Sequence, residues 1–402
     1  MSSWWLDLKL GMRMLVKYPG LALAGGAGIA VAVAIAAGGY SAVAANYAPG
    51  ALPLPDSERL VVIEEWDAAR NRVEARIGFD FAEWRRGLRS IRDLAAFQTV
   101  TANLIQEGVT PGSVRVAAMT ASGFAAARVQ PLMGRVLVEG DAHVAVVGEQ
   151  LWRSRWGGNR NVLGSAIRLG AEPYTVVGVM PEGFGFPVNH ELWVPWREDA
   201  AWRGPAEGSE LTVFGRLAEG ATLESAQAEL AAFGARRARE FPAIYGKLRV
   251  QALPFPYPFL AMHTADDVGG LYVMQGLVAS MLVLVCLNVA ILVFTRTSTR
   301  QTEMAVRTAL GASRGRIVGQ MFLEALVLAS GAAGAGVLLA AWAMRELRIA
   351  TMDLSRELPY WVAFRLTPDG VLYALVLAVL AAAIIGIVPA WQATKMGAAK
   401  QG

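Results

Sequence analysis

The chain has almost no cysteine. Cys286 is the single cysteine among 402 residues, and it lies inside a long hydrophobic run. One cysteine excludes a disulfide within the chain, and a thiol in apolar surroundings is typical of packing rather than of redox chemistry. The sequence therefore has neither a disulfide framework nor the paired cysteine spacing of a zinc site.

Motifs of catalytic sites are missing as well. Adjacent carboxylates occur at Glu64 with Glu65 and at Asp266 with Asp267, and we interpret both pairs as exposed and solvated rather than as an acid or metal pair. No HExxH or GxSxG segment surrounds any histidine, so we interpret all three as structural or surface residues. They are His143, His190 and His263. This argues against a membrane-embedded enzyme.

The sequence contains no GxxxxGK[ST] segment. The run "GGNRNVLGS" at 157–165 has glycines but lacks the lysine that contacts phosphates. We therefore expect this chain to hold no ATP-Mg, metal or other cofactor, and not to be an enzyme by itself.

Charged residues are scarce. They make up 17% of the chain, hydrophobic residues make up 54%, and the mean hydropathy is +0.39. These values are too apolar for an ordinary soluble protein, so part of the chain is expected to lie in lipid. Four runs reach the roughly 20 apolar residues that a bilayer core requires. They are 21–47, 271–294, 317–344 and 371–391.

Positive charge is concentrated in the short segments that flank these runs. Residues 1–20, 295–316 and 392–402 carry a net charge of +8, whereas 48–270 has 23 basic and 26 acidic residues. Cytoplasmic loops carry the excess of lysine and arginine. We therefore predict a cytoplasmic amphipathic N-terminal segment, a cytoplasmic C-terminus and an outer domain at 48–270. No basic domain remains to support nucleic-acid binding.

The first hydrophobic run has an alternative interpretation as a cleaved signal peptide, because "SAVAANYAPG" resembles a cleavage site. The run at 21–47 and the 20 residues before it are long for such a signal, so an uncleaved span is favoured. Its glycines and alanines would allow neighbouring helices to approach closely.

The outer segment contains patterns of both helices and strands. An amphipathic helix is predicted where apolar residues recur at steps of three and four with arginines between them. These apolar residues are Phe81, Trp84, Leu88, Ile91 and Ala95. A second helix is predicted after Thr222 as N-cap, with Glu224 in its first turn; its apolar face is Leu223, Ala226, Leu230 and Phe233.

Short β-rich runs lie between these two helices. They include "RLVVIEEW", "HVAVVGE", "SAIRLG" and "YTVVGVM", with a turn signal at 170–173. We therefore predict an α-helical membrane protein with four transmembrane helices and a large α+β extracytoplasmic domain between the first and second spans.

The segment "TRQTEMAVRTALGASRGRIVGQ" at 299–320 joins the second and third spans. Arg300, Glu303, Arg307 and Arg314 share one helical face, and Glu303 with Arg307 forms an i,i+4 pair. Gly311 is placed to end this helix and Ser313 to begin the next. The residues alone leave two interpretations open: a basic loop that only fixes topology, or a helix on which a cytoplasmic partner acts.

Glu324 is the one acidic residue inside a span. A snorkelling side chain or a helix-packing hydrogen bond is favoured over a proton relay, because one carboxylate without partners forms no pathway. We expect Gly331, Gly334 and Gly336 in the same span to serve packing.

Several segments resemble the MacB/FtsX-type permeases of ABC transporters. "LNVAILVFTRTSTRQTEMAVRTALGASRGRIVGQMFLEAL" is similar to the FtsX-type signature after the second span. Other stretches resemble the MacB-type periplasmic core domain: "VVGVMPEGFGFP" with "LWVP", "LWRSRWGGNRNVLGSAIRLGAEPYTVVGV" and "RLAEGATLESAQAEL". The N-terminal stretch "DLKLGMRMLVKYPG" resembles the family's segment before the first span. The positions that match the coupling motif are Arg300, Glu303, Arg307, Leu310, Gly311, Ala312, Ser313 and Arg314.

This resemblance implies a mechanotransmission permease in a bacterial inner membrane. It implies a MacB-like domain at 48–270 and an FtsX-like permease domain at 271–402, whose segment 295–316 couples to a cytoplasmic ABC ATPase dimer that binds ATP-Mg. It also implies a second permease unit, and a periplasmic adaptor or another external partner. The tail stops short of the usual extension, so we expect either self-association or one half of a duplicated permease.

Two functions from different classes remain open. One is efflux or extraction of a drug, peptide or lipoprotein-like substrate, favoured because the outer domain resembles the MacB type throughout. The other is a signalling platform that activates an external partner such as a cell-wall hydrolase.

Overall fold

The chain divides into two compact units. The computed structural model describes residues 19–48, 50–106, 109–197, 204–299, 314–351 and 358–399. The helical unit comprises Met1–Ala45, Asp266–Met352 and Ala363–Gly402. The α/β unit comprises Asn46–Ala265 and, in addition, the short segment Asp353–Val362, which lies between two helices of the other unit in the sequence.

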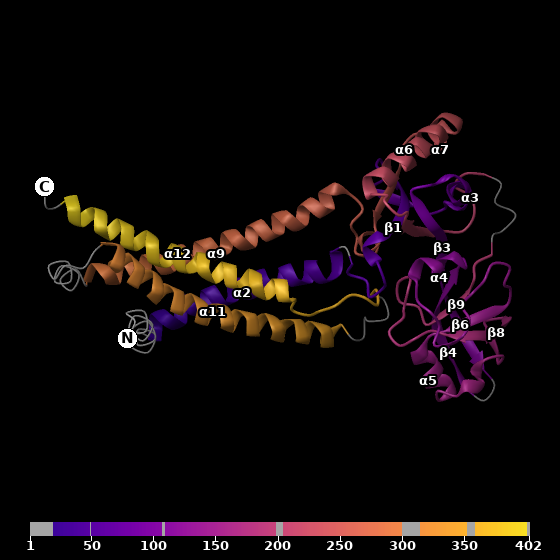
Figure 1. Cartoon of the computed structure of the whole chain (residues 1–402), viewed down its shortest axis with the longest axis horizontal. Helices are drawn as coiled ribbons and strands as arrows, with labels where there is room; N and C mark the ends of the chain where they lie inside the picture. Colours follow the sequence, from indigo (N-terminus) through magenta and orange to yellow (C-terminus); the bar gives the residue numbers. More distant parts are fainter. Residues whose placement is uncertain are drawn as a thin grey trace. The chain divides into compact units, whose positions relative to one another are not determined.

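The described part of the helical unit consists of four long helices (Figure 1). Each contains a stretch that is long and apolar enough to cross a membrane. The helices are α2 (Pro19–Tyr47), α9 (Ala265–Thr299), α11 (Arg314–Ala350) and α12 (Pro368–Ala399). The four spans predicted from hydropathy are therefore confirmed as helices.

Small residues bring α2 close to α9. A Cβ added at Gly25 would lie 3.0 Å from Val289, and one added at Gly28 would lie 3.0 Å from Val285. The core between the helices is rich in alanine, which also permits close approach. Because lipid supplies no hydrophobic force between helices, such contacts hold the helices together. The first span is thus packed, as its composition predicts.

The three glycines of α11 differ from one another. A Cβ at Gly336 would lie 2.6 Å from the carbonyl oxygen of Ala30 on α2, whereas a Cβ at Gly331 or Gly334 would meet no described atom within 4 Å. The prediction that all three serve packing is therefore confirmed for Gly336, and for the other two it stays a prediction. Their helical spacing places them on exposed parts of α11.

The α/β unit contains one large sheet and several short helices (Figure 1). Its strands are β1 (Leu60–Asp67), β2 (Arg72–Glu74), β3 (Ile91–Gln106), β4 (Val109–Met119), β5 (Met133–Gly134), β6 (Val144–Val147), β7 (Ala166–Leu169), β8 (Glu172–Val179), β9 (Leu192–Pro195), β10 (Thr212–Leu217) and β11 (Leu248–Pro254). Its helices are α3 (Gly78–Gly87), α4 (Ser122–Ala127), α5 (Glu149–Trp156), α6 (Leu223–Glu240), α7 (Pro242–Tyr245) and α8 (Pro256–Phe259).

The strands follow the order β11-β1-β10-β3-β4-β9-β6-β8-β5, with β2 beside β1 and β7 beside β3 and β8. Most pairs are antiparallel, but β4 with β9 and β6 with β8 are parallel. Helices and a mixed sheet together confirm the α+β class predicted for the segment between the first two spans.

Local signals in the sequence account for several of these elements. The four quoted β-rich runs form β1, β6, β7 and β8. Gly170 has φ +60° in the two-residue turn between β7 and β8, a conformation that glycine adopts easily. The side chain of Thr222 accepts a hydrogen bond from the Ser225 amide and so caps α6, as predicted.

The first predicted amphipathic helix is only partly right. Phe81 and Trp84 lie on α3, which ends at Gly87, but Ile91 and Ala95 belong to β3. Ile91 and Ala95 are four residues apart, a spacing that fits one face of a helix and also one face of a regular strand, so the pattern continues from α3 into β3. Within β3 a β-bulge, where Asp93 (φ 50°) and Leu94 oppose Gly215 of β10, turns Ile91 and Ala95 to opposite faces of the sheet.

Strand β1 is buried on both faces. Leu60 and Val62 pack into an aromatic core on one face of the sheet, and Val61 and Ile63 pack against α3 and α6 on the other. A strand that is covered on both sides has a continuous run of apolar residues in its sequence, because side chains on both faces are buried. This position also determines where the two glutamates that follow must lie.

Candidate functional site

The predicted coupling segment lies almost entirely outside the described residues. These undescribed positions are Arg300, Glu303, Arg307, Leu310, Gly311, Ala312 and Ser313. Its eighth member, Arg314, is the first residue of α11, and α9 ends at Thr299 just before the segment. The segment thus directly joins two membrane helices, and the coupling role of its residues stays a prediction.

Glu324 lies on α11 among partly buried side chains. Gln320, one turn earlier, donates a hydrogen bond from Nε2 to Glu324 Oε1 at 3.2 Å. The Glu324 carboxylate therefore has a hydrogen-bond donor on its own helix. The contact is compatible with a packing role, and the choice between that role and proton transfer stays a prediction.

The histidines occupy three different environments. His190 is buried, its Nε2 lies 3.0 Å from the Thr99 hydroxyl, and its Nδ1 accepts from the Val188 amide. Burial, aided by the charge of Arg115, lowers the pKa of His190 to about 3, so it is neutral. His143 Nδ1 lies 3.2 Å from the Pro173 carbonyl oxygen. Among the described residues no group of three or more His, Cys, Asp or Glu is arranged to hold a metal ion.

The interpretation of Glu64 and Glu65 as exposed is wrong, because 4% and 2% of their surfaces are accessible. Both follow the apolar run of β1 within the same strand, so they point to opposite faces of a sheet that is covered on each side. Asp266 is exposed, as expected. The hydrophobic run before the glutamates was the signal that indicated their burial.

Glu64 binds the chain just before α9. It accepts hydrogen bonds from Gln251 Nε2 at 2.7 Å and from His263 Nδ1 at 3.2 Å, and the His263 ring stacks on Trp66. Burial raises the pKa of Glu64, while Gln251 and His263 lower it. These contacts fasten residue 263 to the edge of the sheet.

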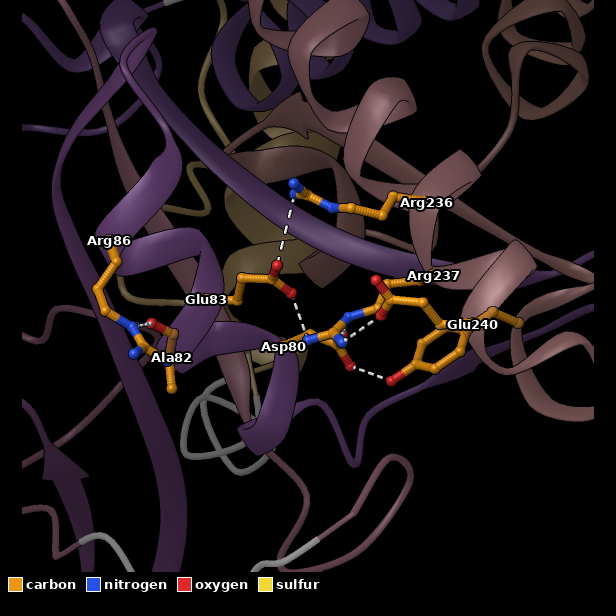
Figure 2. Close-up of polar contacts among 8 residues, drawn as sticks. Asp80, Ala82, Glu83, Arg86, Arg236, Arg237 and Glu240 are labelled. Atoms are coloured by element: carbon orange, nitrogen blue, oxygen red, sulfur yellow. Dashed lines mark hydrogen bonds and ion pairs between the residues drawn. The ribbon is translucent and has the colours of Figure 1, made fainter.

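Glu65 points to the opposite face, where the charges of Asp80 and Arg237 act on it. Asp80 and Arg237 belong to a polar cluster that joins α3 to α6 (Figure 2), and Tyr245 of α7 contacts the same Asp80. Arg237 donates from Nε to Asp80 Oδ1 at 3.1 Å and from Nη1 to Glu240 Oε2 at 3.1 Å, and it also pairs with Glu83. Tyr245 donates its hydroxyl to Asp80 Oδ2 at 2.6 Å. One guanidinium therefore contacts three carboxylates from two helices and offsets part of their charge.

The electrostatics of this cluster follow from its acid excess. Burial raises the pKa of Asp80, although Tyr245 and Arg237 oppose the shift. Burial, followed by the charges of Asp80 and Glu74, raises the pKa of Glu65 to about 9. Glu65 is thus protonated at neutral pH. The cluster acts as a structural clamp, and sequence reasoning missed it because its members are 157 residues apart.

The α/β unit is linked to the helical unit by four passages of the chain. They fall at 45–46, 265–266, 352–353 and 362–363. The last two arise because the segment between α11 and α12 belongs to the α/β unit. Each of the four long helices is therefore joined covalently to the α/β unit at one end.

Four apolar helices with a large α/β unit between the first and second define a multi-pass membrane protein with an extracytoplasmic domain. Residues 21–233 match the family of the MacB-like periplasmic core domain, and residues 276–398 match the FtsX-like permease C-terminal family. The chain therefore belongs to the MacB/FtsX-type permeases of ABC transporters.

A curated relative is the macrolide export ATP-binding/permease protein MacB 1 of Aeromonas hydrophila. The two are 26% identical over 266 residues, which cover 63% of this chain and 37% of the relative. The chain thus corresponds to less than half the length of that protein.

Two solved structures are similar to part of the chain. A permease-protein domain from Porphyromonas gingivalis is 15% identical with a TM-score of 0.41, covering 50% of this chain and 92% of that one. The periplasmic region of MacB from Actinobacillus actinomycetemcomitans is 16% identical with a TM-score of 0.38, covering 48% and 88%.

Proposed function

We propose that this permease works by mechanotransmission. A separate cytoplasmic ATPase dimer binds ATP-Mg, and its closure moves the four helices, which pass the movement to the extracytoplasmic domain. The observation that carries the proposal is the fourfold covalent linkage of that domain to the helices. Displacement of any helix along its axis reaches the domain directly.

The sequence supports a division of labour with a partner ATPase. The chain has no phosphate-binding loop, and the basic segment at 299–314 offers a docking helix between the second and third spans. Placement in a bacterial inner membrane with both termini in the cytoplasm would present this segment to the ATPase. A second permease unit would supply the other half of the assembly.

For the transported molecule we propose a drug, peptide or lipoprotein-like substrate, handled by the extracytoplasmic domain together with a periplasmic adaptor. The relative from Aeromonas hydrophila is named for macrolide export, which favours export over signalling. In this scheme the helices transmit force and the substrate does not pass between them, since Glu324 is the one acidic residue within the predicted spans.

Affinity purification in mild detergent tests the proposal. The chain should recover an ABC ATPase together with a periplasmic adaptor, and ATP turnover should require that ATPase. Metal-dependent turnover by the pure chain would contradict the division of labour. Recovery of a cell-wall hydrolase in place of an adaptor would favour the signalling alternative.

A further inference from the structure

An aromatic cluster in the α/β unit gathers described side chains near three of its four connections to the long helices, those at 45–46, 265–266 and 362–363. Helix α8 precedes α9 by five residues, and Tyr257 on α8 packs edge-on against Tyr47 at the end of α2, with 6.3 Å between ring centroids. Trp361, from the segment between α11 and α12, lies 5.8 Å from both Phe255 and Phe259. All of these residues belong to the α/β unit.

The segment 358–362 is held firmly in this unit. The Tyr360 amide donates to the Val188 carbonyl at 2.7 Å, and Asn189 Nδ2 donates to the Leu358 carbonyl at 3.0 Å. A Cβ at Gly185 would come within 2.8 Å of Tyr360, so only glycine permits this contact. Trp361 is 4% exposed and belongs to the same core as the central strands.

Two features distinguish this segment from ordinary core filling. The Tyr360 hydroxyl and Trp361 Nε1 are buried without a hydrogen-bond partner among the described residues. Burying polar groups in this way opposes folding, so the ring packing and the two hydrogen bonds of the segment must offset that cost. In addition, α8 continues directly from β11 through Phe255, whose amide donates to the Leu60 carbonyl at 3.1 Å. The cluster is therefore attached to β11 and β1 at one edge of the sheet.

From these contacts we propose that α8 and residues 358–362 form a joint through which movement of α11 and α12 shifts the extracytoplasmic domain relative to α9, with Trp361 as the residue that positions it. The inference rests on the proposed mechanotransmission function. Without the Trp361 ring, α11 and α12 would move without displacing the sheet, because their shared connection would no longer be anchored to α8.

The test uses the full chain with its co-purified ATPase in lipid nanodiscs. Spin labels are attached to Ser209→Cys and Asp266→Cys in a Cys286→Ala background, since both sites are exposed and lie in different units. The distance between the labels is measured before and after addition of ATP and vanadate, and ATP turnover is measured on the same samples. Thermal unfolding reports the stability of each variant.

We expect the parent to show an ATP-dependent change in distance, Trp361→Ala to lose it while ATP turnover persists, and Trp361→Phe to retain it. The matched control is Phe124→Ala, which truncates a ring of the same core, 3% exposed, on α4 away from every connection. It should lower stability yet retain the distance change. Such a result would show that Trp361 positions the domain and that a loss of stability alone does not abolish the distance change.

Three outcomes would overturn the joint. If Trp361→Ala keeps the distance change, the ring does not position the domain. If Phe124→Ala loses it as well, general core stability explains the effect. If the parent itself shows no change although its ATPase turns over, the proposed function fails and the joint fails with it.

Discussion

Arg237 shows how one residue can organise an acidic region. Its side chain is 11% exposed, while that of its partner Asp80 is 2% exposed, so the pair is largely removed from water. The guanidinium also lies 4.5 Å from the centre of the Phe79 ring, which covers it. Removing one partner of such a pair is costly, because the remaining charges stay buried without compensation.

We expect Arg237→Ala to lower the free energy of unfolding of the extracytoplasmic domain by about 3 kcal/mol. The neighbouring Arg236 pairs with the same Glu83 at 3.4 Å, but its side chain is 52% exposed. Arg236→Ala should therefore cost no more than about 1 kcal/mol. Thermal or denaturant unfolding of both variants in detergent measures the difference, and equal losses would show that the cluster is not the clamp described.

Glu65 predicts a dependence of stability on pH. Its folded-state pKa of about 9 lies above that of an unfolded glutamate, so the folded chain binds a proton that the unfolded chain has released between these values. Stability should therefore fall as pH rises from about 5 to 9, by up to about 1.4 kcal/mol per pH unit from this group.

Glu65→Gln keeps the size of the neutral acid but cannot ionise. We expect this variant to gain stability over the parent at pH 8 and to lose most of the difference at pH 5. The measurement is the unfolding midpoint of parent and variant at each pH across this range. Parallel pH profiles for parent and variant would mean that Glu65 does not carry the effect.

Among the elements, α2 and α11 approach each other through Gly336. Adding a methyl group there meets the Ala30 carbonyl, and relieving the clash should cost about 1 to 3 kcal/mol. Gly334→Ala is the matched control, since its Cβ would meet no described atom within 4 Å. We expect the thermal midpoint of Gly336→Ala to fall while that of Gly334→Ala is maintained. Equal midpoints would contradict the close crossing of the two helices.

The coupling segment is tested by Glu303→Lys. The substitution replaces an attractive i,i+4 pair worth about 0.3 kcal/mol by a repulsive one, so a local helix should survive. Docking of the ATPase should fail, because like charges across a desolvated interface can cost several kcal/mol. Co-purification of the ATPase at equal membrane abundance is the measurement. Thr302→Lys also introduces a lysine next to this position but keeps Glu303, and it should retain the partner; full recovery with both variants would leave only a topological role.

Periodicity predicted α6 fully and α3 only in part, and the reason is physical. The apolar face of α6 packs on one side of the sheet, so its helical spacing persists from Leu223 through Leu230. After α3 the same spacing continues by chance into β3, because Ile91 and Ala95 are four residues apart. A step of four fits both a helix and a strand, so the local pattern cannot distinguish them, and pairing with β10 makes the difference.

For the whole molecule, orientation in the membrane is the main expectation. If 295–316 is cytoplasmic, a cysteine at Ser298 in a Cys286→Ala background should resist an impermeant reagent in intact cells. Cysteines at Ser113 and Ser209, both exposed in the extracytoplasmic domain, should react. After permeabilisation Ser298→Cys should react too. Labelling of Ser298→Cys from outside would reverse the proposed topology.

The sequence by itself determined the four membrane helices, the position of the α/β domain between the first two and the family, because hydropathy over about 20 residues and local motifs depend on neighbours in the chain. Only the tertiary structure decided that Arg237 joins α3 to α6 and that Trp361 packs into the α/β unit. These contacts join residues as far apart in the sequence as Asp80 and Arg237. Their partners are set by how the sheet and helices pack, and no local pattern encodes that packing.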